Sequence, residues 1–222
     1  MDAADWSFPT AIRFGPGRIT ELPEVLSLLG IGRPLLVTDE GVVELPILRN
    51  TQALLVEADV DAMLYSNLQG NPTEANVNGG LEMLRSANCD GVIAFGGGSA
   101  LDAGKTIAMM AGQSRPLWDY VDGEETWMLV DPQGILPVVA VPTTAGTGSE
   151  VGRAAVILDE TTGKKRIPWH PKMLPSMVIS DPQLTLGLPP NITAWTGIDA
   201  RVHAIEAVCS PVYHPMADGI GV

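Results

Sequence analysis

Short apolar runs alternate with amphipathic stretches over most of the chain. Five of these runs are predicted to be strands: 34–38 (PLLVT), 62–65, 91–95 (GVIAF), 136–141 (LPVVAV) and 177–180. Several are almost entirely apolar, as is typical of strands covered on both faces. Between them, residues 73–87 and 100–110 carry apolar side chains at helical spacing. The alternation predicts an α/β fold, with a parallel sheet whose strands are joined by crossover helices.

The pattern changes at Pro189-Pro190, after which helical periodicity and strong helix formers continue without another strand candidate. We therefore expect an α/β domain over residues 1–187 and the start of a helical region over residues 188–222. The last segment, MADGIGV, begins an apolar pattern and shows no capping residue or polar tail. On this pattern Val222 is expected to be a point at which a longer chain was cut.

Composition narrows the class of protein. Of the 222 residues, 45% are hydrophobic and 18% charged, which favours a folded chain over a disordered one. A net charge of −13 repels phosphate backbones and anionic lipid, so neither nucleic acid nor a membrane is an expected partner. Two cysteines without CxxC spacing suit free thiols in the cytoplasm. The acidic residues Asp122, Glu124 and Glu125 are predicted to form a solvated loop.

The segment FGGGSALDAGK, residues 95–105, runs from a buried-type strand through three glycines and a serine into a helix. Glycine permits close backbone approach, so the amides of Gly97, Gly98 and Ser99 can converge on an anion such as a phosphate. Ser99 is also predicted to cap the helix through its hydroxyl. The segment matches neither GxGxxG nor GxxxxGKS/T. The alternative is a tight turn without a ligand, although a turn does not need three consecutive glycines.

Two further polar sites follow predicted strands. Asp39, after PLLVT, can accept hydrogen bonds from a ribose diol and repel a 2′-phosphate, which favours NAD over NADP. In TDEG, however, it is equally typical of a turn or a helix cap. The loop PTTAGTGSE, residues 142–150, places hydroxyls where open α/β sheets bind ligands, unless it is a turn that satisfies its own backbone. These hydroxyls belong to Thr143, Thr144, Thr147 and Ser149.

Asp199 and His203 are four positions apart in a helical context, so their side chains share one face of the helix. A carboxylate and an imidazole together suit divalent iron, zinc or manganese. Because a catalytic metal needs about three protein ligands, an ordinary helix pair is the alternative. The other two histidines, His170 and His214, are predicted to lie on the surface without a role in a site.

Taken together, the chain resembles the iron-containing (group III) alcohol dehydrogenase family. Seven motifs in the family's order carry the resemblance along nearly the whole chain: FPTAIRFGPGRI, VTDEG, NPT, GGGSALDAGK, PTTAGTGSEV, SDPQLTLGLPP and TGIDARVHAIEA. The resemblance implies a dinucleotide-binding α/β domain, followed by an all-helical metal-binding domain, with the active site in the cleft between them. It also implies a small alcohol or aldehyde as the substrate, and a homo-oligomer.

By position in these motifs, the resemblance assigns Asp39 to the adenosine ribose and Asn71 to a loop beside the cofactor. It assigns the pyrophosphate loop, and the aspartate that follows it on the helix, to Gly97, Gly98, Ser99 and Asp102. The hydroxyls of Thr143, Thr144, Thr147 and Ser149 match the loop around the ribose and nicotinamide.

Lys165 matches a lysine near the cofactor, with Lys164 as a competing match. Asp199 and His203 match the first two of four metal ligands for Fe²⁺ or Zn²⁺, and the sequence ends before the two later histidines. Arg201 departs from the family, which usually has an apolar residue there.

The implied chemistry is hydride transfer between NAD and an alcohol carbon, with the metal polarising the substrate oxygen. With half of the metal ligands, the 222-residue chain alone is expected to bind NAD weakly and to turn over poorly or not at all. Two alternatives stay open at this point. One is a naturally short, non-catalytic cofactor-binding module, and the other is an activity like that of maleylacetate reductase within the same architecture.

Overall fold

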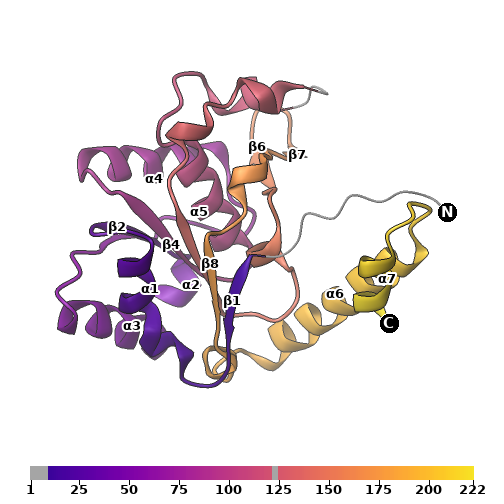
Figure 1. Ribbon diagram of the computed structural model, residues 1–222, viewed down its shortest axis with the longest axis horizontal. Coiled ribbons are helices and arrows are strands. Elements are labelled where there is room, and N and C mark those ends of the chain that lie inside the picture. The colour runs from indigo at the N-terminus through magenta and orange to yellow at the C-terminus, as the bar shows by residue number, and fades with distance from the viewer. Residues whose placement is uncertain (1–9, 122–124) are drawn as a thin grey trace.

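A six-stranded parallel sheet forms the centre of the protein. The computed structural model describes residues 10–121 and 125–222, so the first residues of the FPTAIRFGPGRI motif, and the predicted solvated loop at 122 and 124, lie outside the described part. The strands lie in the order β1-β8-β5-β4-β2-β3 (Figure 1). In that order they span Ala11–Phe14, Met177–Ser180, Val138–Pro142, Gly91–Gly96, Pro34–Val37 and Met63–Tyr65.

Helices cover both faces of this sheet, because successive strand residues point to opposite sides. Val92 and Ala94 of β4 share one core with α4 (Glu74–Ser86) and α5 (Gly98–Met110). Ile93 and Phe95 share the other core with α1 (Leu22–Leu28) and α3 (Pro46–Glu57). A single turn, α2 (Glu40–Val43), follows β2. Burial on both faces explains why the strands read as continuous apolar runs.

Two additions extend from this body. An antiparallel hairpin is formed by β6 (Ile157–Asp159) and β7 (Lys164–Arg166). The long helix α6 (Pro190–Cys209) projects away from the sheet and the short α7 (Pro215–Gly221) folds back on it (Figure 1). No residue of α6, all of which is described, is buried. Short 3-10 turns occupy Arg18–Glu21, Leu117–Tyr120, Thr126–Leu129, Pro132–Gly134, Ser149–Val151, Pro171–Met173 and Pro182–Thr185.

The predicted α/β class is confirmed, and the five predicted strands and two crossover helices end within two residues of their observed bounds. The sequence pattern misses β1, because its residues are mostly exposed and show no apolar alternation. It also misses both strands of the hairpin, β6 and β7, whose sequences are ILD and KKR. The division at residue 187 stays a prediction. Among the helices of the described part, none is long and apolar enough to cross a membrane.

Candidate functional site

The glycine loop forms the turn between β4 and α5. Gly96 has a φ of 146°, and a Cβ there would lie 2.8 Å from the Cβ of Ala100. The helix begins at Gly98 with Gly97 as its N-cap, and no side chain caps it. The prediction that Ser99 is the cap is therefore wrong, because the helix starts one residue before it. The first-turn amides of α5 have no capping side chain, which leaves them suited to an anion.

The second polar loop is tied directly to the first. The backbone N–H of Thr143 donates to the carbonyl of Gly96 at 2.9 Å, across the adjacent ends of β4 and β5. A Cβ on Gly98 would lie 2.7 Å from Cγ2 of Thr147, so the two loops pack closely. Gly146 lies equally close to α6, since its Cβ would be 2.7 Å from the carbonyl oxygen of Thr196. This loop therefore joins the α5 N-terminus to α6.

A cavity of about 580 Å³ opens where these elements meet. This volume is within the usual range for small-molecule sites, about 300–1,000 Å³. Of the thirteen residues predicted for a cofactor or metal, nine line it: Asn71, Gly98, Ser99, Asp102, Thr147, Ser149, Lys165, Asp199 and His203. Four do not line it: Asp39, Gly97, Thr143 and Thr144. Of the two competing lysines, Lys165 lines this cavity, whereas Lys164 lines only a neighbouring pocket on the hairpin.

Asn71 and Ser99 come together from different elements. Asn71 has a φ of 59°, in the left-handed region, three residues before the start of α4. Its backbone N–H donates to Oγ of Ser99 at 3.4 Å. The hydroxyl of Ser99 is thus oriented by the neighbouring loop and retains its own proton for donation. This arrangement brings the loop after β3 to the N-terminus of α5.

Asp39 lies outside the cavity, at the end of β2. One carboxylate oxygen accepts the N–H groups of Gly41 (2.9 Å) and Val42 (3.1 Å) and so caps α2. The other oxygen lies 3.3 Å from where a Cβ on Gly96 would be. Burial raises the pKa of Asp39, and the backbone N–H groups oppose this shift. Beside it, the buried hydroxyl of Thr38 finds no hydrogen-bond partner among the described residues. A donating diol fits this pair of polar groups.

Asp102 faces the protein interior as well as the cavity. It accepts the hydroxyl of Ser149, the N–H of Val156 at 2.8 Å and, at 3.1 Å, the ammonium of Lys105. Sequence reasoning misses Lys105, which is only 1% exposed. Its neighbours from Ala103 to Ile107 are mostly small or apolar, but they do not indicate which acceptors its ammonium meets.

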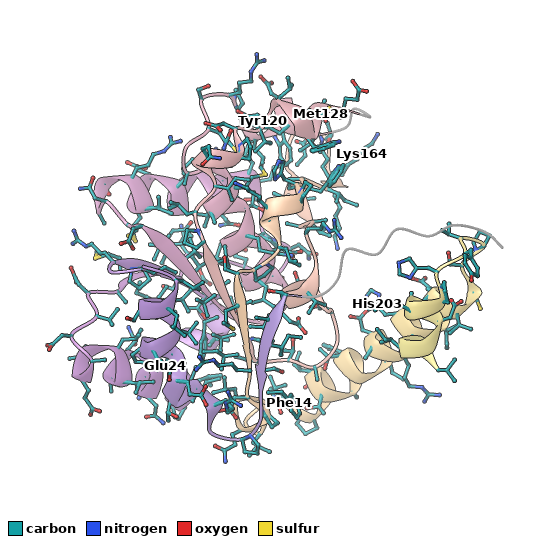
Figure 2. All side chains as sticks on the ribbon, in the orientation of Figure 1. Phe14, Glu24, Tyr120, Met128, Lys164 and His203 are labelled. Atoms are coloured by element: carbon teal, nitrogen blue, oxygen red, sulfur yellow. The ribbon has the colours of Figure 1, made fainter. Side chains whose placement is uncertain are left out.

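Asp199 and His203 lie on the α6 wall of the cavity, where His203 is labelled in Figure 2. His203 Nε2 and Asp199 Oδ2 are 3.7 Å apart. Two ligands at about 2.1 Å from one metal ion are separated by about 3–3.6 Å, so a small adjustment would let both bind one ion. Within the described ranges, no cluster of three or more His, Cys, Asp or Glu side chains could hold a metal. These two residues suit divalent iron or zinc in donor type, and additional ligands are required.

The other two histidines have local structural roles. The surface prediction for His170 is wrong, because it is only 6% exposed. Its Nδ1 accepts the N–H of Lys172 at 3.0 Å, and its ring packs edge-on against Trp127. Its position before a proline suggested a loop, but the aromatic cluster around it is visible only in the fold. His214 is partly buried and accepts the N–H of Ala217 at the start of α7.

The chain is similar to known dehydrogenases over its full length. It is 37% identical to alcohol dehydrogenase 4 of Schizosaccharomyces pombe, with 100% of this chain and 51% of the relative aligned. It is 40% identical to 4-hydroxybutyrate dehydrogenase of Cupriavidus necator, with coverages of 96% and 55%. The chain thus spans about half the length of the curated relatives it matches.

Solved structures show the same architecture. A 1,3-propanediol oxidoreductase superposes with a TM-score of 0.92 at 37% identity, covering 99% of this chain and 56% of that one. A sulfoacetaldehyde reductase from Bifidobacterium kashiwanohense, in complex with NAD⁺, gives 0.90 at 33% identity, with coverages of 100% and 57%. Residues 9–182 match the family described as iron-containing alcohol dehydrogenase. This chain is therefore a member of the iron-containing alcohol dehydrogenase family.

Proposed function

We propose that this chain forms the NAD-binding part of an oxidoreductase that transfers a hydride between NAD and a small alcohol or aldehyde. One observation carries the proposal. A single cavity joins the uncapped N-terminus of α5 to the Asp199–His203 pair of α6. An anion-binding element and two metal-type ligands therefore face the same space. Relatives named as an alcohol dehydrogenase and a 4-hydroxybutyrate dehydrogenase, and a neighbour solved with NAD⁺, support this assignment.

Different residues of this chain would bind and orient successive parts of the dinucleotide. The first-turn amides of α5, with the Ser99 hydroxyl, would hold the diphosphate, because helix N-termini stabilise anions. The free carboxylate oxygen of Asp39 would accept hydrogen bonds from the adenosine ribose. Lys165 would place a positive charge at the cavity in a chain of net charge −13. The nicotinamide end would then lie toward Thr147 and α6.

The substrate end would be defined by Asp199 and His203. A bound NAD would supply the hydride acceptor, and a bound divalent cation the positive charge that favours loss of the alcohol proton. His203 would donate a ring nitrogen to that cation and Asp199 a carboxylate oxygen. Both cysteines, Cys89 and Cys209, are free, which suits the cytoplasmic location that we propose. We also propose a homo-oligomer, as the family resemblance implies.

The dinucleotide assignment is tested by titrating the chain with NADH and following nicotinamide fluorescence. Gly98→Ala should weaken binding about tenfold or more, because it disturbs contacts to a charged group worth about 1.5–3 kcal/mol each. Gly187→Ala is the matched control, since a Cβ there meets no atom within 4 Å. Absence of saturable NADH binding by the unaltered chain would contradict the proposal, as would equal affinities for the two variants.

The metal assignment has its own test. Zn²⁺ titration of the unaltered chain should show weak binding that His203→Gln and Asp199→Asn each reduce, because a two-ligand site loses half of its donors. The same titration with Lys172→Ala controls for nonspecific binding at the surface. Equal Zn²⁺ affinity in all four proteins would remove Asp199 and His203 from the proposal and leave the NAD assignment intact.

A further inference from the structure

Lys105 presents a buried cation to a converging set of oxygen atoms. Its side chain extends from α5 and is 1% exposed. The ammonium donates to the carbonyls of Ser149 (2.9 Å), Gly152 (3.4 Å) and Ala154, and it forms an ion pair with Asp102 at 3.1 Å. An ammonium has three protons to donate, so these four acceptors satisfy it fully. A buried charge without such partners would be strongly unfavourable.

The carbonyls that bind Lys105 all belong to one stretch of backbone. It starts as the short turn Ser149–Val151 and continues in an extended form past Ala154. Five of its members line the cavity: Ser149, Gly152, Ala154, Ala155 and Val156. We call residues 149–156 the wall segment. Lys105 and Asp102 both bind the wall segment from the protein interior, since Asp102 also accepts the N–H of Val156 at 2.8 Å.

Lys105 and Asp102 both belong to α5, the helix whose N-terminus faces the cavity. Both α5 and the wall segment line the cavity, so a shift of the wall segment relative to α5 changes the width of the cavity. Burial lowers the pKa of Lys105, and Asp102 opposes this shift. The proposed NAD and metal sites leave Lys105 without a role, although its burial and its four partners make it a specific feature of α5.

We propose that the Lys105 ammonium is a positioning group that holds the wall segment against α5, and so keeps the cavity in its binding conformation. This inference rests on the proposed function for its effect on NAD, and on the hydrogen bonds and ion pair of Lys105 for its effect on the wall segment. Lys105 does not line the cavity. It acts through Ser149 and Asp102, which do.

The test exploits the shape of the missing group. Lys105→Ala removes three carbons and the ammonium, which is the atom set of n-propylammonium. In this variant, amide hydrogen exchange in residues 149–156 should rise, and NADH affinity should fall about 10- to 100-fold, the range typical of lost supporting contacts. Adding n-propylammonium chloride should restore both. Tetramethylammonium chloride at equal ionic strength has no N–H donor and should restore neither.

Two variants complete the design. Lys105→Met fills the space without a charge, so it should show the same losses and no rescue by n-propylammonium. If Lys105→Ala does not fold, Lys105→Met decides alone. Lys172→Ala is the matched control, because that exposed lysine also donates to a backbone carbonyl, that of Pro132 at 3.1 Å. It should change neither measurement.

The outcomes separate the two proposals. Unchanged exchange and affinity in a folded Lys105 variant would overturn the positioning role, as would a folded Lys105→Ala that n-propylammonium fails to restore. If the unaltered chain does not bind NADH, the proposed function fails. Exchange in residues 149–156, with and without n-propylammonium, then still decides the role of Lys105.

Discussion

Substituting Gly146 by alanine should separate α6 from the loop of residues 142–150. The new Cβ would lie 2.7 Å from the Thr196 carbonyl oxygen and 2.9 Å from its Cβ. Ordinary contact begins at 3.4 Å, so the helix backbone must retreat by about 0.7 Å. A carbonyl of a helix cannot rotate away as a flexible side chain can. Overpacking of this kind typically costs about 1–3 kcal/mol of folding free energy, and this cost should weaken the packing of α6 against the loop.

Hydrogen exchange of residues 190–209 measures this docking. Most of the stability of a helix in a protein comes from tertiary packing, so the amides of α6 should exchange about 5- to 150-fold faster in Gly146→Ala. NADH affinity should change much less, because the amides of the α5 N-terminus stay in place. Zn²⁺ affinity should also change little, because Asp199 and His203 both belong to α6 and move together with it.

Gly197→Ala is the matched control within α6 itself. A Cβ at Gly197 meets no atom within 4 Å, and alanine favours a helix over glycine by about 1 kcal/mol. The same chemical change should therefore slow exchange in α6 instead of accelerating it. Equal exchange in the two variants would refute the claim that Gly146 sets the distance between the loop and the helix.

Two further predictions concern single ionisable groups. Asp39→Asn keeps an oxygen that can cap α2 but loses the charge, so it should lower the preference for NADH over NADPH and leave the unfolding midpoint unchanged. Asp39→Ala should lower that preference too, and it should also cost about 1 kcal/mol of stability because the cap is lost. Titrations with both cofactors and calorimetry measure this, and an unchanged preference in both variants would remove Asp39 from the ribose site. Burial lowers the pKa of His170, with Lys172 adding to the effect, so the unfolded chain binds the proton more readily. Stability contributed by neutral His170 is present above its unfolded pKa and lost as pH falls through the folded value. The unfolding midpoint should therefore drop more between about pH 7.5 and about pH 5.5 in the unaltered chain than in His170→Asn, and parallel curves would contradict this.

The strands could be predicted from sequence because burial on both faces leaves a continuous apolar signal, as in Val92 to Phe95. The glycine loop could be located because three consecutive glycines between an apolar strand and a helix are costly in entropy and typical of close backbone approach. The buried position of Lys105 could not be predicted, because a lysine is counted as solvent-facing when hydrophobic periodicity is analysed. Its three carbonyl acceptors lie 44 to 49 positions later in the chain, so only the fold brings them to its ammonium. The close approach of Gly146 to Thr196 is hidden for the same reason.

The edge strand β1 has a consequence for synthesis of the protein. Ala11 pairs with Met177, so the first strand made must wait for the last strand of the sheet. At roughly 5–20 residues per second, a ribosome needs on the order of 10–30 seconds to produce the intervening chain. During that time Ile12 and Phe14, which stay largely exposed even in the finished sheet, have no strand partner. Pairing of β1 is therefore a late event, and the sheet is completed only after β8 has been synthesised.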